Sequence, residues 1–309
     1  MKITLKNWLT LLVLSLVWGS SFILIKKGLN SFTPYQLGSL RVVFAGIMLL
    51  PTAFINRKQF PRKNYPWLIL CAVVGSFIPM FLFPVAEMHL DSSIAGIMNA
   101  LMSIFVIVLG AVFFKYKTNY GELTGVTLAF IGVILLLQNS STEGGTTNHL
   151  WFYYTILIIA AMMYAFSGLL TQKYMGNISP LTWTAFIELV LFLPALLTLY
   201  LSGFFEVLAH NDNAWEGVGY IFVLSLFGSV LANIFYYKLI GETSASFASS
   251  VSLLMPIVAF MWGLLDGENL GLIQISGGVL IIAGLYFGRK NIKIKYPFRK
   301  NRKGTLSKR

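Results

Sequence analysis

The most regular feature of this chain is a succession of long apolar runs joined by short polar connections. The runs cover residues 8–27, 34–56, 66–88, 92–115, 121–138, 150–173, 180–202, 215–240, 244–265 and 270–288. A run of about 20 apolar residues matches the hydrocarbon core of a bilayer. Lipid offers no hydrogen-bond partner to an open backbone, and these runs are too long for barrel strands. The pattern therefore predicts an all-α polytopic membrane protein with ten transmembrane helices.

Composition excludes a soluble fold. Of the 309 residues, 57% are hydrophobic and only 11% are charged, whereas a soluble domain carries about 25% charged residues. The net charge of +12 would suggest nucleic acid as the partner of a soluble protein. Here the basic residues lie in short connections and one tail, so the expected partner is the lipid bilayer and not nucleic acid.

The same basic residues predict an orientation. With the N-terminus in the cytoplasm, all but three of the 23 lysines and arginines fall in cytoplasmic connections or tails. The exceptions are Lys26, Lys27 and Arg41. This bias follows the positive-inside rule and predicts a multi-pass protein of a cell (inner) membrane with both termini cytoplasmic. The basic cytoplasmic tail, residues 290–309, either binds anionic lipid or only fixes the topology.

The two halves of the chain resemble each other in order and spacing. At one constant spacing, the recurring pairs are Ser21 and Ser167, Leu24 and Leu170, Lys27 and Lys173, and Pro34 and Pro180. At a slightly larger spacing, they are Ser92 and Ser244, Leu101 and Leu253, Gly125 and Gly277, and Gly132 and Gly284. The change of spacing is expected in a longer loop after the seventh helix. Because five is odd, two five-helix units, 8–138 and 150–289, must cross the membrane in opposite senses. Such an inverted repeat is typical of secondary transporters.

Several motifs in this frame resemble the EamA branch of the drug/metabolite transporter superfamily. The motifs are WGSSF at 18–22 closed by Lys26 and Lys27, Pro34 followed by Arg41, DSSIAG and TSASFASS at the starts of the fourth and ninth helices, and the glycine-spaced fifth and tenth helices. The resemblance covers about residues 8–289. It implies a carrier of small metabolites, such as amino acids, in which helices 1–4 and 6–9 surround a cavity and helices 5 and 10 support it. The resemblance also predicts an acidic pair after the fourth and ninth helices; the second half has Asp266 and Glu268, but the first half has Lys115 and Lys117.

Two charges inside predicted helices are the sharpest candidates for a binding site, because a charge at mid-membrane is costly and usually lines a cavity. From their helix starts, Arg41 lies about 10 Å below one membrane face and Glu188 about 12 Å from the other. Arg41 is expected to hold a carboxylate or another anion, with Glu188 facing an amine or taking a proton. Two alternatives remain: the two side chains pair in one state and part in another, or Arg41 extends to the surface and Glu188 is protonated or hydrogen-bonded between helices.

Further substrate-binding candidates are polar or aromatic side chains within helices. They are Trp18, Tyr164, Trp183, Asn99 and Asn233. The aromatic residues form cavity walls or only pack, and the amides bind substrate or tie helices together. Glu87, near the end of the third helix, either gates the mouth and couples protons or lies solvated at headgroup level. Lys26 and Lys27 are expected to meet Asp91 or the acidic outer loops. The serine-rich face at 244–252 either lines the cavity or packs closely.

These features favour a secondary transporter that exports small metabolites by alternating access. Two alternatives stay open at this stage: a non-transporting membrane subunit or receptor, and an intramembrane enzyme. The chain lacks a Walker motif, an HExxH motif and a Cys/His cluster with metal-ligand spacing, so no enzymatic activity, cofactor or metal is expected. A helical core without a cavity would favour the subunit or receptor.

Overall fold

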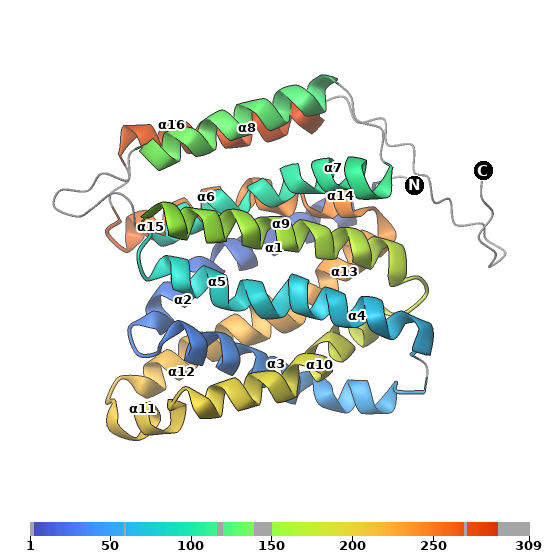
Figure 1. Ribbon diagram of the computed structural model, residues 1–309, viewed down its shortest axis with the longest axis vertical. Helices are drawn as coiled ribbons and strands as arrows, with labels where there is room; N and C mark the ends of the chain where they lie inside the picture. The colour runs from blue at the N-terminus through green and yellow to red at the C-terminus, as the bar shows by residue number, and fades with distance from the viewer. Residues whose placement is uncertain (1–2, 59, 116–119, 139–149, 269–270, 290–309) are drawn as a thin grey trace.

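The computed structural model describes residues 3–289 except 59, 116–119, 139–149 and 269–270, and its described residues form helices without strands (Figure 1). The helices of the first half are α1 (Leu5–Gly19), α2 (Ser21–Leu29), α3 (Pro34–Ile55), η1 (Arg62–Asn64), α4 (Tyr65–Ala72), η2 (Val73–Phe77), α5 (Ile78–Glu87), α6 (Ser92–Asn99), α7 (Leu101–Phe114) and α8 (Tyr120–Gln138). Those of the second half are α9 (Leu150–Tyr174), α10 (Pro180–Leu201), α11 (Phe204–His210), α12 (Ala214–Val223), η3 (Leu224–Leu231), α13 (Ala232–Glu242), α14 (Ala245–Ala248), α15 (Val251–Leu265) and α16 (Leu272–Arg289).

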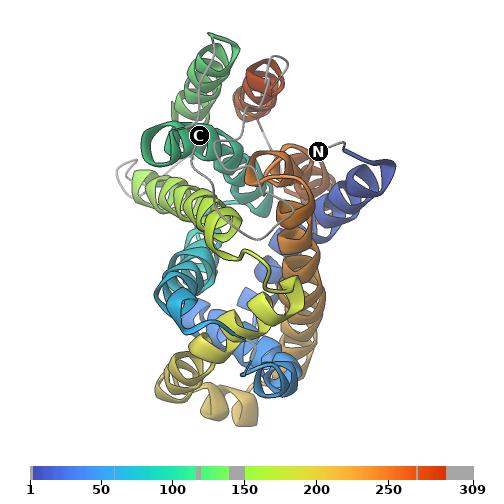
Figure 2. The same cartoon turned by 90° about the vertical axis from the view of Figure 1, so that its right-hand side faces the viewer.

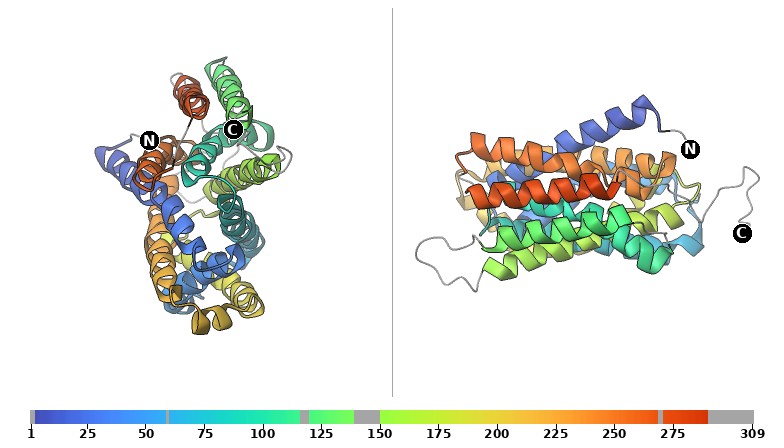
Figure 3. Two further views of the ribbon diagram at one scale, coloured as in Figure 1. Left: turned by 90° about the vertical axis from the view of Figure 1, so that its left-hand side faces the viewer. Right: turned by 90° about the horizontal axis from the view of Figure 1, so that it is seen from above.

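Among the described residues, eight continuous helical stretches are long and apolar enough to cross a membrane. They correspond to eight of the ten predicted helices, and the fifth and tenth are present as α8 and α16, the latter as a shorter apolar helix. The prediction of an all-α polytopic membrane protein is therefore confirmed. Of its ten predicted spans, eight are long and apolar enough to cross a membrane in the described residues. Helix α1 begins and α16 ends at the same end of the bundle (Figure 3). We call this the terminal end and the other the opposite end.

The segment after the seventh span differs from the prediction. A loop was expected there, but residues Phe204–His210 form α11. Gly203 has the left-handed backbone conformation, with φ of 72°, which a glycine adopts without a Cβ clash. Phe204 is buried, and Val207 and Leu208 pack against the core. The apolar side of this short segment is therefore covered, which stabilises the helix.

The two halves bury small residues against each other at equivalent positions. Gly75 in η2 lies against Ser167 in α9, and Gly228 in η3 lies against Ser21 at the start of α2. A Cβ on Gly228 would come within 3.0 Å of the Ser21 hydroxyl oxygen, and one on Gly75 would overlap Ser167. Each contact joins one half to the other, and each pair is the repeat equivalent of the other. Small residues at such crossings let helix backbones approach closely.

The fourth and ninth spans cross where both helices are interrupted. The Ser103 hydroxyl donates to the carbonyl of Ser249 at 2.5 Å, and the Ser252 hydroxyl donates to the carbonyl of Ala100 at 3.4 Å. The two serine hydroxyls, of Ser103 and Ser252, also lie 2.7 Å apart. Each of these carbonyls also accepts a backbone N–H from its own half, from Ser103 to Ala100 at 3.1 Å and from Ser252 to Ser249 at 3.0 Å, so the hydroxyls add a second bond that joins the two halves. These serines of the 244–252 face act in helix packing.

Helices α8 and α16 lie side by side at one edge of the bundle (Figure 2). A Cβ on Gly132 would come within 2.6 Å of the Gly277 carbonyl oxygen, and one on Gly284 within 2.5 Å of the Gly125 carbonyl oxygen. These four glycines are two of the pairs that recur in the sequence. The close approach of the two backbones therefore requires glycine at Gly132 and Gly284.

Replacing either glycine of this contact should destabilise the protein. Gly132→Ala and Gly284→Ala should each lower the free energy of unfolding by about 1–3 kcal/mol, the usual range for overpacking. Melting of the purified protein in detergent, followed by tryptophan fluorescence, measures the change. Gly219→Ala in α12 is the matched control, because a Cβ there meets nothing within 4 Å. Unchanged melting of both variants would contradict the packing account.

Candidate functional site

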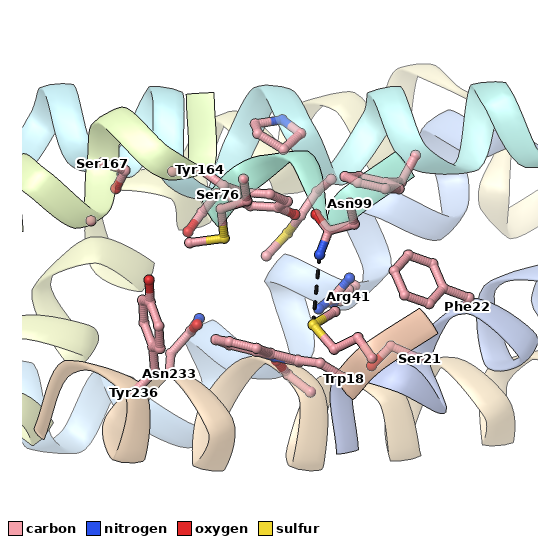
Figure 4. A pocket seen from close by; sticks show the side chains of 18 of the residues that line it. Trp18, Ser21, Phe22, Arg41, Ser76, Asn99, Tyr164, Ser167, Asn233 and Tyr236 are labelled. Carbon is pink, nitrogen blue, oxygen red and sulfur yellow. Dashed lines mark hydrogen bonds between the residues drawn. The ribbon is translucent and has the colours of Figure 1, made fainter. Parts of the chain in front are cut away.

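A cavity lies between the two halves, near the middle of the bundle. It contains about 820 Å³ of space not filled by protein atoms, including open space at its mouth. Spans from both halves supply its walls. Figure 4 shows Trp18, Arg41, Asn99 and Tyr164 projecting toward the same space. Five of the sequence-predicted residues line it: these four and Asn233.

Arg41 is the only charged residue among the described residues that line the cavity. Its Nε donates to the Ser229 hydroxyl at 2.7 Å, and the Ser225 hydroxyl donates to its backbone carbonyl at 2.7 Å. No carboxylate of the described residues lies within ion-pair distance of its guanidinium, although Glu188 and Glu87 lie within electrostatic range. Arg41 is thus held in place through Nε, and its two terminal nitrogens have no hydrogen-bond partner among the described residues.

The π-helical turn η3 provides the groups that hold Arg41 and Trp18. A π-turn widens the helix by one residue per turn and is frequent at functional sites. The Trp18 indole N–H donates to the carbonyl of Gly228 at 2.7 Å, and the next residue, Ser229, accepts the bond from Arg41. The first half has a π-turn as well, η2, whose Gly75 and Ser76 line the cavity. Both turns contain a Gly-Ser dipeptide, but the same dipeptide occurs within the regular helix α3 at Gly38 and Ser39, so the sequence alone does not identify the π-turns.

The remaining walls are mainly aromatic or sulfur-containing. The ring of Trp18 packs edge-on against Tyr236 at a centroid distance of 5.0 Å, and Tyr164 stacks on Phe83 at 5.8 Å. The Asn99 amide donates to the Met255 sulfur at 3.6 Å, a bond drawn in Figure 4. A site of this composition can enclose an apolar body and hold one polar end.

Three predicted candidates are buried away from the cavity walls. Glu188 is fully buried, and Glu87 is 7% exposed; neither carboxylate has a hydrogen-bond partner among the described residues. Glu87 is therefore not solvated at headgroup level. Trp183 is fully buried and stacks against Phe60 at 6.1 Å. Neither the two carboxylates nor Trp183 line the cavity with Arg41.

A cluster of charges lies at the opposite end of the bundle. Lys26 contacts Asp266 at 2.9 Å and Glu268 at 2.8 Å, and Lys27 also pairs with Asp266. The lysines thus meet the loop after the ninth span; Asp91 is not one of their ion-pair partners. Ile25 lines the cavity, and Lys26 is the next residue along the chain. The charged cluster therefore begins one residue after a cavity-lining position.

Glu268 also binds the start of α6. Its carboxylate accepts bonds from the backbone N–H groups of Ser92 and Ser93, at 3.0 and 3.1 Å, and from their hydroxyls, at 2.6 and 2.5 Å. A carboxylate at a helix N-terminus satisfies free N–H groups and opposes the positive end of the helix dipole. Gly267, with φ of 81°, makes the left-handed turn that brings Glu268 back to α6. The sequence analysis had expected Lys26 and Lys27 to meet Asp91 or the acidic outer loops, but it had not linked Glu268 to the start of α6.

The surroundings of the two acids change their pKa values. Burial acts to raise the pKa of Glu268, but bonds from Lys26, Ser92 and Ser93 outweigh it and hold that pKa below its ordinary value. Hydrogen bonds from Lys27 and Lys26 lower the pKa of Asp266 as well. Both carboxylates are therefore ionised at neutral pH.

The equivalent position at the terminal end carries no charge. Gln172 in α9 occupies the repeat position of Lys26, and its side-chain oxygen accepts a bond from the Ala245 N–H at 2.5 Å. The Ser244 hydroxyl accepts from the Phe247 N–H at 3.0 Å. An amide and a hydroxyl thus hold the start of the ninth span, where a carboxylate holds the start of the fourth.

The model of the EamA-like transporter family matches residues 6–138 and 151–288. This chain belongs to the EamA-like transporter family. EamA-like relatives cover nearly its whole length: an "Uncharacterized transporter" of Archaeoglobus fulgidus is 25% identical over 91% of this chain and 98% of that relative. The "Probable amino-acid metabolite efflux pump" of Salmonella typhimurium is 28% identical over 94% of this chain and 96% of that protein.

A solved structure shares the fold of this EamA-like chain. It superposes with a TM-score of 0.61 at 13% sequence identity and covers 92% of this chain and 96% of its own. At this identity the likeness shows the fold alone. The resemblance expected from the sequence motifs is therefore confirmed at the level of family and fold.

Removing the charge of Glu268 should destabilise the protein in a pH-dependent way. Glu268→Gln keeps the size but weakens hydrogen bonds to a charged group, which contribute about 1.5–3 kcal/mol each. A carboxylate with a lowered pKa stabilises the fold above the unfolded pKa and ceases to do so as pH falls through the folded pKa. The melting temperature of Glu268→Gln should therefore lie below that of the wild type at pH 7, and the gap should narrow below the ordinary glutamate pKa of 4.5.

Thermal melts in detergent across this pH range measure the effect. The control is Glu206→Gln, because Glu206 is exposed and has no ion-pair partner among the described residues. A gap that stays constant with pH would contradict the role of the Glu268 charge.

Proposed function

We propose that this protein is a secondary transporter that exports small metabolites, amino acids or related polar and aromatic solutes, through the cavity around Arg41 by alternating access. The observation that carries the proposal is a cavity between the two halves, in which Arg41 has no carboxylate within ion-pair distance among the residues that the structure describes. A non-transporting subunit or receptor has no need of such a cavity. Family membership supports transport over intramembrane catalysis. The names of the two efflux-pump relatives, from Salmonella typhimurium and Escherichia coli, support export.

The proposal includes an orientation. The positive-inside bias supports a cell (inner) membrane location with both termini cytoplasmic, which makes the terminal end the inner one. In this orientation the cluster of Lys26, Lys27, Asp266 and Glu268 is the outer closure of the cavity. It ties the first and fourth spans to the loop after the ninth, so opening to the outside requires these ion pairs to separate.

Substituting Arg41 tests the substrate site. Arg41→Ala should lower the transport rate by about ten- to hundredfold, the equivalent of one or two lost bonds to a charged group. Uptake into proteoliposomes, tested with labelled amino acids, carboxylates, sugars and cationic drugs, measures it. Arg57→Ala, an exposed arginine after α3, is the matched control and should transport normally. Normal transport by Arg41→Ala at equal expression would remove Arg41 from the site.

Glu188 is proposed to bind and release the coupling proton. An ionised carboxylate without a partner is costly inside a protein, so a change in the surroundings of Glu188 during the cycle would change its proton affinity. Its position within electrostatic range of Arg41 supports a link between proton and substrate. Glu87, also buried without a partner, is a second proposed proton or gating group.

Neutralising Glu188 should separate transport from the pH gradient. Glu188→Gln should retain exchange of substrate across the membrane and lose accumulation driven by a pH gradient. Proteoliposomes with and without an imposed gradient measure both, with Glu206→Gln as the control. Wild-type rates that do not depend on a pH gradient would overturn proton coupling through Glu188.

A further inference from the structure

The charges on the cavity walls indicate the class of substrate, which membership of the family alone does not. Arg41 is the only charged side chain among the described lining residues, and no acidic residue accompanies it there. A zwitterionic amino acid would bring a carboxylate for Arg41 and an ammonium group for which the walls offer no carboxylate. A monoanion would neutralise the buried cation, and burying unpaired charge is the costly outcome in a membrane protein.

The geometry around Arg41 favours a carboxylate as the bound group. The Nε bond to Ser229 uses one of the five N–H donors of the guanidinium. The donors on the two terminal nitrogens have no partner among the described residues and are grouped as a fork, which matches the two oxygens of a carboxylate. Ser229 thus orients the fork without competing for it.

The other walls favour an apolar, preferably aromatic, body. Trp18, Phe83 and Tyr164 present ring surfaces, and Met80, Met102 and Met255 present flexible thioethers. Aromatic surfaces bury large apolar area in defined geometry, and methionine adapts to irregular shapes. The Trp18 indole N–H and one Asn99 amide N–H are already used within the protein, by Gly228 and Met255. The Asn99 side-chain oxygen has no partner among the described residues and offers a neutral acceptor, which can bind a hydroxyl but does not balance the charge of an ammonium group as a carboxylate would.

We propose that the cavity selects organic monoanions, with a carboxylate bound to Arg41 and an apolar body against the aromatic walls, in preference to zwitterionic amino acids. This inference rests on the proposed function, because it names the substrate class of the same cavity. It narrows the proposed range of solutes to those without an ammonium group.

Three compounds with the same phenylethyl skeleton test the inference. They are 3-phenyllactate, an anion; phenylalanine, a zwitterion in which an ammonium group replaces the hydroxyl; and phenethylamine, a cation. Calorimetric titration of the purified full-length protein should give a Kd for 3-phenyllactate at least about tenfold lower than that for phenylalanine. Phenethylamine should not bind. In Arg41→Gln, the preference for the anion should disappear, whereas Arg57→Gln should retain it.

The outcomes separate this inference from the proposed function. If phenylalanine binds as tightly as 3-phenyllactate, the aromatic walls hold its ammonium group and the inference is overturned, whatever the transport result. Failure of 3-phenyllactate to bind also overturns it. Binding of 3-phenyllactate without flux in proteoliposomes would support the substrate class and overturn the transport function. Saturable flux of phenylalanine in preference to the anion would support the transport function and overturn the proposed substrate class.

Discussion

The structure depends on the need to satisfy backbone polar groups where helices in a membrane are interrupted. Lipid supplies no hydrogen bonds, so each break must find its partner within the protein. Here the breaks repeatedly accept a side-chain donor from the other half of the chain as well. The carbonyl of Ala100 is bound by Ser252, that of Ser249 by Ser103, and that of Gly228 by Trp18. These bonds join the two halves around a common centre.

The cavity is a result of the same arrangement. The π-turns η2 and η3 lie near the middle of their spans. Their glycines let the two halves approach closely at Ser167 and Ser21, and residues beside these contacts line the cavity. Arg41 lies in this region because Ser229, on one of the π-turns, holds its Nε. A charge that would be unfavourable in lipid is thus kept in a polar setting that belongs to both halves.

The sequence predicted the helices and the central residues well, and its errors have identifiable causes. Hydropathy depends only on residue type, so it located the spans, and the cost of buried charge singled out Arg41. The repeat listed the glycines of the fifth and tenth helices as equivalent pairs, but it did not predict that Gly132 would contact Gly277. Sequence spacing could not predict that Glu188 lies off the cavity, because one residue of register on a helix turns a side chain by about 100°. It also missed α11, whose apolar side is too short to give a periodic signal.

The role of Glu268 could not be predicted for a different reason. Its partners, Lys26 and Ser92, lie far from it in sequence, and their meeting depends on the left-handed turn at Gly267. A short loop with two acids is indistinguishable from any solvated connection until the start of α6 is placed beside it.

The exchange of Lys26 for Gln172 at equivalent positions makes the two ends of the molecule respond differently to ionic strength. Lys26 is about one-third exposed, with 32% of its side chain accessible, so dissolved ions screen its pairs over a Debye length of about 8–10 Å at physiological salt. The bond between Gln172 and the Ala245 N–H involves no net charge and is screened far less. A saltier medium therefore weakens the ion pairs at the opposite end of the bundle and spares the hydrogen bond at the terminal end, so ionic strength acts unequally on the two ends.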